Sequence, residues 1–338
     1  MSTVVPISAV VPTRDRAVAL YRMLEGLAEQ ELLPAELIVV DGSSDATSRQ
    51  VVTDWSKYVA NKCLVKWQPA AELGAAVQRN QGVGFATQPF IWFLDDDILF
   101  EPGCAKRLWQ AIEDDETLGG VNAMITNQRY TKPGLLTQSL YCVLGGNRRD
   151  KYAGKCIGPA FNILPEDDPA LPEVVPVDWL NTTCTIYRRK ALPTPPFHAH
   201  FTGYSLMEDL ALSLTVGEKW KLANARTARI YHCSPPAPYK EDRSAIAKME
   251  LLNRHFIMTQ ILRRRSRLDY LKLWLLELFR IVSPLTSVRA WRGLLPVLMG
   301  KCRALRSIIG ARHTNAGEAV ACRQKKGHIN STHGFDRA

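Results

Sequence analysis

The stretch FIWFLDDDILFEPG, residues 90–103, decides the fold of this chain. Five apolar residues, from Phe90 to Leu94, lead directly into three consecutive aspartates, and apolar residues then follow again. A buried strand cannot hold ionised carboxylates in its interior, because removing each charge from water is costly unless a cation or a hydrogen-bond donor compensates. We therefore expect a buried strand whose carboxyl end presents the aspartates to water, a metal ion or a ligand.

Strands and helices alternate along the first hundred residues. Val4–Val11 and Ala35–Asp41 are rich in β-branched residues and predict buried strands. Between them, apolar residues recur on one face of a helix. Similar patterns predict helices at about 45–59 and 73–85 and a short strand at 63–68. This order predicts an α/β fold with a Rossmann-like, doubly wound, mostly parallel sheet, whose ligands bind beyond the carboxyl ends of the strands.

Four segments resemble, in order and spacing, those of family 2 inverting glycosyltransferases of the GT-A fold. The segments are AVVPTRDRAVALYRMLEGLAEQ (9–30), ELIVVDGSSDAT (36–47), AAELGAAVQRNQGVGFATQPFIWFLDDD (70–97) and GYSLMEDLALSLTV (203–216). The resemblance covers roughly residues 2–232 and implies transfer of a sugar from a nucleoside-diphosphate sugar. The sequence departs from the family at DGSSD, which is shorter between its acidic positions than is usual, so the roles of Ser43, Ser44 and Asp45 stay open.

The aspartates are expected to bind a metal ion and the donor. In the Asp-x-Asp pattern, Asp95 and Asp97 point to one side of an extended backbone, and oxygen ligands suit Mg²⁺ or Mn²⁺. Such a cation neutralises the charge that develops on the leaving diphosphate. The resemblance implies that Asp97 is the direct metal ligand, with Asp95 or Asp96 reaching the ribose or a metal-bound water. Alone, three acidic residues would indicate only a solvated loop.

The ends of the first two strands are expected to hold the nucleotide. Pro12, Thr13 and Arg14 follow the first strand, and Asp41 ends the second, where its carboxylate could accept a hydrogen bond from a uracil imide or a ribose hydroxyl. In the family, the matching positions surround the base. The alternatives are a surface charge for Arg14 and a turn or helix cap for Asp41.

The motif QRNQG, residues 78–82, also matches a family motif near the nucleotide. Arg79 is expected to pair with a phosphate or with the aspartates, and Asn80 to lie beside it. The alternative for Arg79 is a charge on the surface of a helix.

A second acidic motif, SLMEDLALSLTV at residues 205–216, predicts the catalytic base. Its leucines recur at helical spacing, which puts Glu208 and Asp209 near a helix N-terminus, where the macrodipole favours an ionised carboxylate. Inversion by direct displacement requires a base that takes the proton from the attacking hydroxyl. The resemblance implies that Asp209 is this base and Glu208 its supporting carboxylate, or the base if the register shifts by one. The alternative is the usual preference for acidic residues in a first helical turn.

The remaining predictions for this half concern His232 and the acceptor. His232 ends a predicted strand, where a neutral imidazole can complete the metal site, although a lone histidine is as often a polar core or surface residue. Asp178 and Trp179 are expected to contact the acceptor sugar, with core packing as the alternative for Trp179. Residues from about 124 to 176 lack clear periodicity and are expected to form an insertion over the site.

The C-terminal quarter differs in composition from the rest. Residues 251–338 hold 17 Lys and Arg against 4 Asp and Glu, whereas the whole chain has a net charge of +10. From residue 263 onward, charges interrupt every apolar run before it reaches the length of a membrane span. This pattern predicts amphipathic basic helices at an anionic membrane surface, or helices that pack on the catalytic domain or a partner. Processive polysaccharide synthases of the family carry a Gln-x-x-Arg-Trp motif. QILRR, residues 260–264, lacks its tryptophan, so we expect a non-processive enzyme that adds one sugar each time it binds an acceptor.

Together these patterns predict a donor-binding half (1–120), an acceptor-binding half (121–240), a membrane-associating region (241–312) and a disordered tail (313–338). The absence of a signal-peptide pattern and of Cys-x-x-Cys pairs favours the cytoplasmic face of an inner membrane, or the cytoplasm. The expected acceptor is a saccharide or a lipid-linked saccharide in cell-surface polysaccharide synthesis, and nucleic acid is not expected. The alternatives are a nucleotidyltransferase that makes a sugar nucleotide and a non-catalytic scaffold; the sequence leaves oligomeric state open.

Overall fold

The computed structural model describes residues 3–60, 62–145, 152–233, 241–283, 291 and 293–310. The chain divides into two compact units, Met1–Ala237 with Asn253–Leu278, and Pro238–Leu252 with Phe279–Ala338. The predicted disordered tail, residues 313–338, lies outside the described residues.

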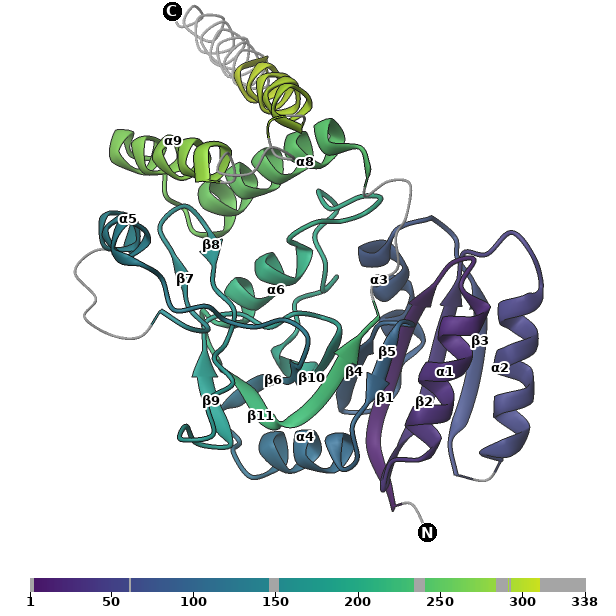
Figure 1. Cartoon of the computed structure of the whole chain (residues 1–338). Coiled ribbons are helices and arrows are strands. Elements are labelled where there is room, and N and C mark those ends of the chain that lie inside the picture. The colour runs from purple at the N-terminus through teal and green to yellow at the C-terminus, as the bar shows by residue number, and fades with distance from the viewer. Residues whose placement is uncertain are drawn as a thin grey trace, which may run out of the picture. The chain divides into compact units, whose positions relative to one another are not determined.

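The first half of the larger unit alternates strands and helices as the sequence predicts (Figure 1). In chain order these elements are β1 (Thr3–Thr13), α1 (Ala17–Ala28), β2 (Leu32–Asp41), α2 (Thr47–Tyr58), β3 (Leu64–Pro69), α3 (Ala75–Phe85), β4 (Phe90–Leu94), β5 (Ile98–Phe100), α4 (Cys104–Glu113) and β6 (Leu118–Ile125). The buried strand expected before the three aspartates is β4, and it ends directly before Asp95.

The second half is less regular. It contains α5 (Leu135–Gly145), β7 (Cys156–Ile157), β8 (Phe161–Asn162), β9 (Val174–Val177), β10 (Cys184–Arg188), a 3₁₀ turn (Arg189–Ala191), α6 (Glu208–Val216) and β11 (Lys221–His232). The segment expected to be an insertion, about residues 124–176, thus supplies α5 and three short strands. Beyond it lie α8 (Arg243–Phe256), a π-helical turn (Ile257–Ile261) and α9 (Arg267–Val282), and α8 and α9 each contribute residues to both units.

The main sheet has the strand order β3-β2-β1-β4-β10-β6-β11-β5, with β9 beside β11. Strands β1 to β4 pair in parallel, as do β6 and β11. Strand β10 runs antiparallel to both β4 and β6, and β5 and β9 run antiparallel to β11. The predicted α/β fold is confirmed; the antiparallel pairs arise from contacts between distant segments, which local patterns do not reveal.

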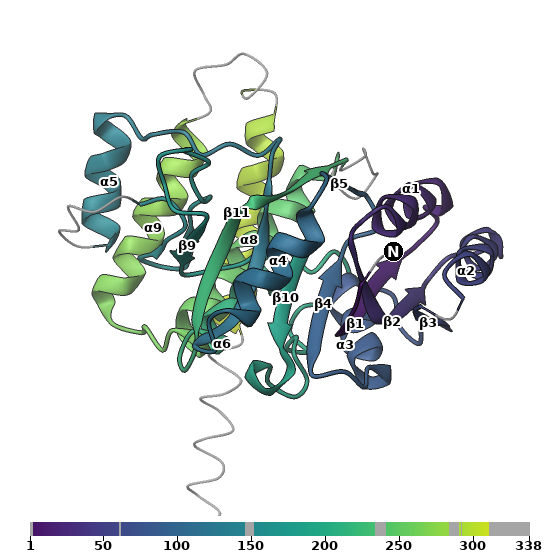
Figure 2. The same cartoon turned by 90° about the horizontal axis from the view of Figure 1, so that it is seen from below.

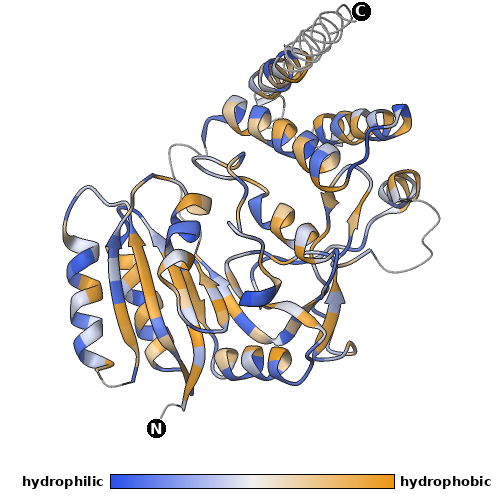
Figure 3. Ribbon diagram, turned by 180° about the vertical axis from the view of Figure 1, so that it is seen from behind, coloured by the Kyte–Doolittle hydropathy of each residue, from blue (hydrophilic) through white to orange (hydrophobic). Residues whose placement is uncertain are grey.

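The sheet is buried on both faces because alternate residues of each strand point to opposite sides. In β1, Ala9 and Val11 pack in the core beneath α1, α2 and α4, whereas Val10 packs in the core beneath α3 and α6. Figure 2 shows α1 and α3 on opposite sides of the strands, and the inner strands are coloured hydrophobic in Figure 3. Because helices cover both faces of the sheet, polar side chains are expected at the ends of the strands.

In the smaller unit, Glu250 of α8 connects two other segments. Glu250 forms ion pairs with Arg280 and, at 3.1 Å, with Lys301, which belongs to a helix over residues 293–310. Lys301 is only 7 % exposed. Of the helices that the structure describes, none combines the length and apolarity needed to cross a bilayer.

Candidate active site

Three strand ends bring the predicted metal ligands together. Parallel pairing of β1 with β4 places Thr13 and the Asp95–Asp97 segment at the same edge of the sheet. Strand β11 pairs antiparallel with β5, so that His232 lies opposite Ile98, and the Cys233 amide donates to the carbonyl of Asp97 at 2.8 Å. His232 and Cys233 therefore lie beside the aspartates although they are more than a hundred residues away in the sequence.

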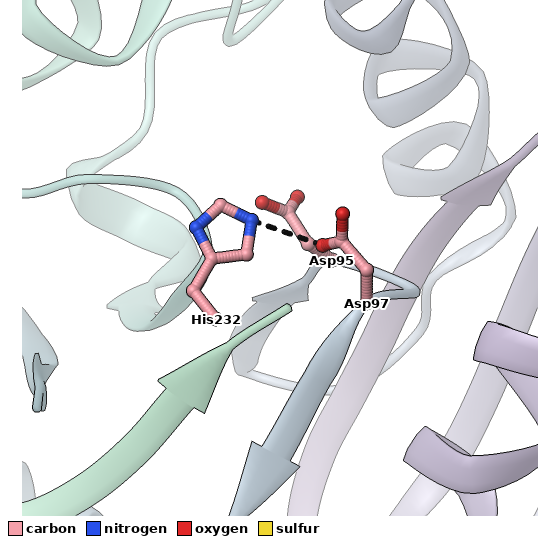
Figure 4. Close-up of side chains that lie close together, drawn as sticks. All are labelled: Asp95, Asp97 and His232. Carbon is pink, nitrogen blue, oxygen red and sulfur yellow. Dashed lines mark ion pairs between the residues drawn. The ribbon is translucent and has the colours of Figure 1, made fainter. Parts of the chain in front are cut away.

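Asp95, Asp97 and His232 form a compact cluster (Figure 4). One ligand atom from each lies within 4.8 Å of the others. The Nε2 atom of His232 lies 3.0 Å from Oδ1 of Asp97. The two carboxylates are oxygen ligands of the kind that suit Mg²⁺ or Mn²⁺, and a neutral imidazole could complete the site.

Asp96 is not part of this cluster and contacts Thr13 at the end of β1 and Arg16 directly before α1. The hydroxyl of Thr13 donates to Asp96 Oδ2 at 2.7 Å, and Arg16 Nη1 donates to Asp96 Oδ1 at 3.1 Å and to Asp97 Oδ2 at 3.0 Å. Burial raises the pKa of Asp96 to about 6, against the lowering effects of Arg16 and Thr13. Arg16 was not predicted; its signal was a cation two residues beyond the predicted Arg14, within the same PTRDR segment.

The other residues predicted at the first strand ends differ in their surroundings. Pro12 is half-buried, and Arg14 is exposed, with its Nε 3.5 Å from Asp15. Asp41 is buried and accepts hydrogen bonds from the Ser43 amide at 2.9 Å and from Trp67 Nε1 at 3.0 Å. Each carboxylate oxygen keeps a second lone pair, so contacts from these residues to a nucleotide stay a prediction.

Arg79 links the Asp95–Asp97–His232 cluster to the predicted base motif. Its guanidinium is buried and lies 2.5 Å from Asp95 Oδ1 and 2.9 Å from Glu208 Oε1. Burial lowers the pKa of Arg79, but the two carboxylates raise it by more, so the group stays charged. Of the aspartates expected as partners of Arg79, it contacts Asp95, and pairing with a phosphate stays a prediction. Asn80 exchanges two hydrogen bonds with the backbone of Phe197, at 2.8 and 2.9 Å.

Glu208 and Asp209 begin α6, as the sequence predicts. Burial, followed by the charge of Asp209, raises the pKa of Glu208 to about 8, and burial raises that of Asp209 to about 6. Neighbouring carboxylates with separated pKa values can take different roles. The pKa of Asp209 lies below neutral pH, so its carboxylate is ionised there.

The backbone before α6 is strained. Ser205 (φ 56°) and Met207 (φ 70°) adopt left-handed conformations, which cost residues with side chains free energy and persist only where the surroundings enforce them. Asn253, only 5 % exposed, donates to the carbonyl of Leu206 at 2.6 Å and contacts His200 Nε2 at 3.0 Å. Asn253 was not predicted, because it lies on α8, outside every segment that carried a motif.

The two predicted acceptor residues are unlike each other. Trp179 is 7 % exposed, packs in the core and donates from Nε1 to the carbonyl of Ile163 at 2.8 Å. Asp178 is half-buried, accepts from the Cys156 amide at 3.0 Å and lies 3.4 Å from Lys155 Nζ. The structure thus favours the packing alternative for Trp179.

Comparison with known proteins agrees with this geometry. Residues 8–164 match the family model described as glycosyl transferase family 2. The chain is 31 % identical over 113 residues to the uncharacterized glycosyltransferase YwdF of Bacillus subtilis, which covers 32 % of this chain and 38 % of that protein. It is 35 % identical over 100 residues to validoxylamine A glucosyltransferase of Streptomyces hygroscopicus subsp. jinggangensis, covering 28 % and 23 % of the two chains. The matched region thus spans less than half the length of these relatives.

A solved structure extends the likeness to nearly the whole chain. The mannosyltransferase PcManGT from Pyrobaculum calidifontis, determined in complex with GDP-Man and Mn²⁺, superposes with a TM-score of 0.51 at 16 % identity. The superposition covers 94 % of this chain and 80 % of that one. At this identity the likeness shows the fold. Residues 8–164 therefore match glycosyl transferase family 2, and the chain as a whole has a GT-A fold.

Proposed function

We propose that the protein is an inverting, metal-dependent glycosyltransferase. It moves one sugar from a nucleoside-diphosphate sugar to a hydroxyl of a saccharide acceptor. The observation that carries the proposal is the link through Arg79, which joins the Asp95–Asp97–His232 cluster to the Glu208–Asp209 pair. A metal-ligand set and a base are thereby held at one edge of the sheet.

Asp95, Asp97 and His232 would hold the cation. When bound, Mg²⁺ or Mn²⁺ neutralises the negative charge of the leaving diphosphate. The presence of GDP-Man and Mn²⁺ in the similar mannosyltransferase supports this assignment. The nucleotide itself is expected to lie against Pro12, Thr13, Arg14 and Asp41, at the ends of β1 and β2.

Asp209 takes the proton of the acceptor hydroxyl as its oxygen attacks the anomeric carbon. A pKa of about 6 leaves this carboxylate ionised at neutral pH and close enough in basicity to accept a proton in the transition state. Glu208 keeps Arg79 in place, and Arg79 in turn orients Asp95. Attack on the face opposite the leaving diphosphate inverts the configuration of the sugar.

The acceptor is proposed to be lipid-linked, in the synthesis of a bacterial cell-surface polysaccharide at the cytoplasmic face of the inner membrane. The support is the charge of residues 251–338, with 17 Lys and Arg against 4 Asp and Glu. A basic segment of this kind is attracted to anionic lipid.

The test is release of the nucleotide from its sugar, with Mn²⁺ or with EDTA: a nucleoside diphosphate from UDP-, GDP- and dTDP-linked sugars, and CMP from CMP-linked sugars. Water replaces the unidentified acceptor, so the rate is slow but measurable. Asp97→Asn should lower the rate by about a hundredfold or more, as loss of a main electrostatic contact does. Asp54→Asn, at an exposed site on α2, is the matched control and should retain it.

Other outcomes identify the alternatives. Release of pyrophosphate from a nucleoside triphosphate and a sugar phosphate would indicate the nucleotidyltransferase. Nucleotide binding without turnover of any donor would indicate the scaffold. Equal rates with Mn²⁺ and with EDTA would refute the metal-dependent mechanism.

A further inference from the structure

The outer face of α9 is entirely apolar between residues 268 and 278. Every exposed side chain in this stretch is a leucine or a tryptophan: Leu268 (59 %), Leu271 (63 %), Trp274 (47 %), Leu275 (37 %) and Leu278 (58 %). Scattered exposed leucines are common on protein surfaces, but a contiguous apolar strip marks a site of interaction.

The rotation of α9 about its axis is fixed by its inner face. Leu273, Leu276 and Glu277 are buried, and Glu277 Oε1 lies 3.2 Å from Arg254 Nε on α8, with both side chains at most 3 % exposed. Removing one partner of a buried ion pair is strongly destabilising. The helix therefore cannot turn its apolar face inward without breaking this pair.

Helix α5 lies beside α9 and adds exposed apolar side chains, although Gln138 and Ser139 of α5 are exposed as well. Lys272 of α9 donates to the carbonyl of Leu144 at 3.0 Å, and Figures 1 and 2 both show α5 beside α9. On α5, Leu135 and Leu136 are 84 % and 85 % exposed, and Val143 is 53 % exposed. We name these residues, together with the five exposed residues of α9, the α5–α9 face. It lies within the same compact unit as the candidate active site.

Positive charge borders this face. Arg263, Arg264, Arg265 and Arg267 are all exposed and directly precede the apolar stretch of α9. Within residues 267–278 neither acidic side chain is exposed, because Asp269 is half-buried and Glu277 is buried. A second copy of this face would offer the arginines no carboxylate, whereas anionic lipid headgroups would.

We infer that the α5–α9 face docks on the surface of an anionic lipid bilayer. Leucine and tryptophan side chains enter the boundary between headgroups and acyl chains, and the arginines bind lipid phosphates. The inference rests on the proposed function for its purpose, which is to bring the site to a lipid-linked acceptor. It differs from the sequence prediction because it uses α5 and assigns docking to the catalytic unit itself.

The test is co-sedimentation of the full chain with vesicles of phosphatidylcholine alone or with about 30 % phosphatidylglycerol. The wild type should bind the anionic vesicles and not the neutral ones. Leu271→Ser/Leu278→Ser should weaken binding by about tenfold or more, since each leucine loses its burial in the bilayer. Arg263→Gln/Arg267→Gln should weaken it by about fivefold for each charge removed.

The matched control is Tyr58→Ser/Leu64→Ser, which removes two exposed apolar residues of α2 and β3 (76 % and 56 % exposed) and should bind as the wild type does. The inference would be overturned if the wild type did not bind anionic vesicles, or if the Leu271→Ser/Leu278→Ser variant bound them as tightly as the wild type. A lipid-independent dimer that this variant abolishes would identify a second copy as the occupant instead. Nucleotide binding, measured on the same samples without vesicles, reports on the proposed function separately.

Discussion

Replacing Arg79 by methionine should lower the melting temperature of the protein by about 5 °C. Arg79 is 4 % exposed and forms ion pairs with Asp95 at 2.5 Å and with Glu208 at 2.9 Å. Breaking a buried ion pair by removing one partner costs about 3–5 kcal/mol. We expect the lower figure of about 3 kcal/mol, because Asp95 is 21 % exposed and Glu208, with a pKa of about 8, can become neutral.

The shift in melting temperature follows from the size of the unit that contains the site. For roughly 260 residues, an unfolding entropy of about 2.1 cal/mol/K per residue gives about 0.55 kcal/mol for each degree. A loss of about 3 kcal/mol therefore corresponds to about 5 °C. Arg79→Lys should fall between the wild type and Arg79→Met, since a point charge cannot form two ion pairs in a fixed geometry.

The assay is thermal unfolding followed by circular dichroism in EDTA, so that no metal ion changes the balance of charge. Arg22→Met, at an exposed arginine of α1, is the matched control and should unfold within about 1 °C of the wild type. A melting temperature within about 1 °C of the wild type for Arg79→Met would contradict buried ion pairs from Arg79 to Asp95 and Glu208.

Three further predictions concern the region around α6. Asp209→Asn should lower kcat by about a hundredfold or more with donor binding retained, and the wild-type kcat/KM should fall as pH drops below about 6, where Asp209 becomes protonated; a pH-independent profile would contradict its role as base. The pKa of Glu208 is raised from 4.5 to about 8, so between these pH values the folded state keeps a proton that the unfolded chain releases. The free energy of unfolding therefore falls as pH rises through this window. Glu208→Gln cannot titrate and should lose less melting temperature than the wild type over this range, and equal losses would contradict the raised pKa. Asn253→Leu removes the donor to Leu206 and should lower kcat by about tenfold with the donor KM unchanged, whereas a rise in KM alone would assign Asn253 to donor binding.

The end of β4 could be predicted from the sequence because ionised side chains cannot be buried within a strand. Three aspartates cannot lie inside a sheet, so Asp95 and Asp97 had to follow a strand, and the parallel order of the first strands then places them beside Thr13. The same reasoning cannot separate Arg14 from Arg16, since both lie in the short connection to α1. Only the folded backbone shows that Arg16 contacts the aspartates and that Arg14 is exposed.

Long-range pairing explains the remaining differences. The neighbours of β10 and β5 are strands far away in the chain, and no local period encodes the direction in which they run. Asn253 lies beyond the segments that carried a motif, and its contact with Leu206 exists only because α8 packs near the start of α6. The sequence also could not place Trp179, because a tryptophan can either contact a sugar or pack in the core, as Trp179 does.

Binding of a nucleotide together with Mn²⁺ reports directly on the candidate metal site. The melting temperature of the wild type and of Asp97→Asn is measured with UDP, GDP, dTDP and CMP, each with and without Mn²⁺. At a nucleotide concentration of about a hundred times Kd, binding should add about 2.7 kcal/mol to wild-type stability, or about 5 °C, only when Mn²⁺ is present. The shift should disappear in Asp97→Asn; a shift that persists in this variant, or that needs no metal, would contradict a donor held through the Asp95–Asp97–His232 cluster.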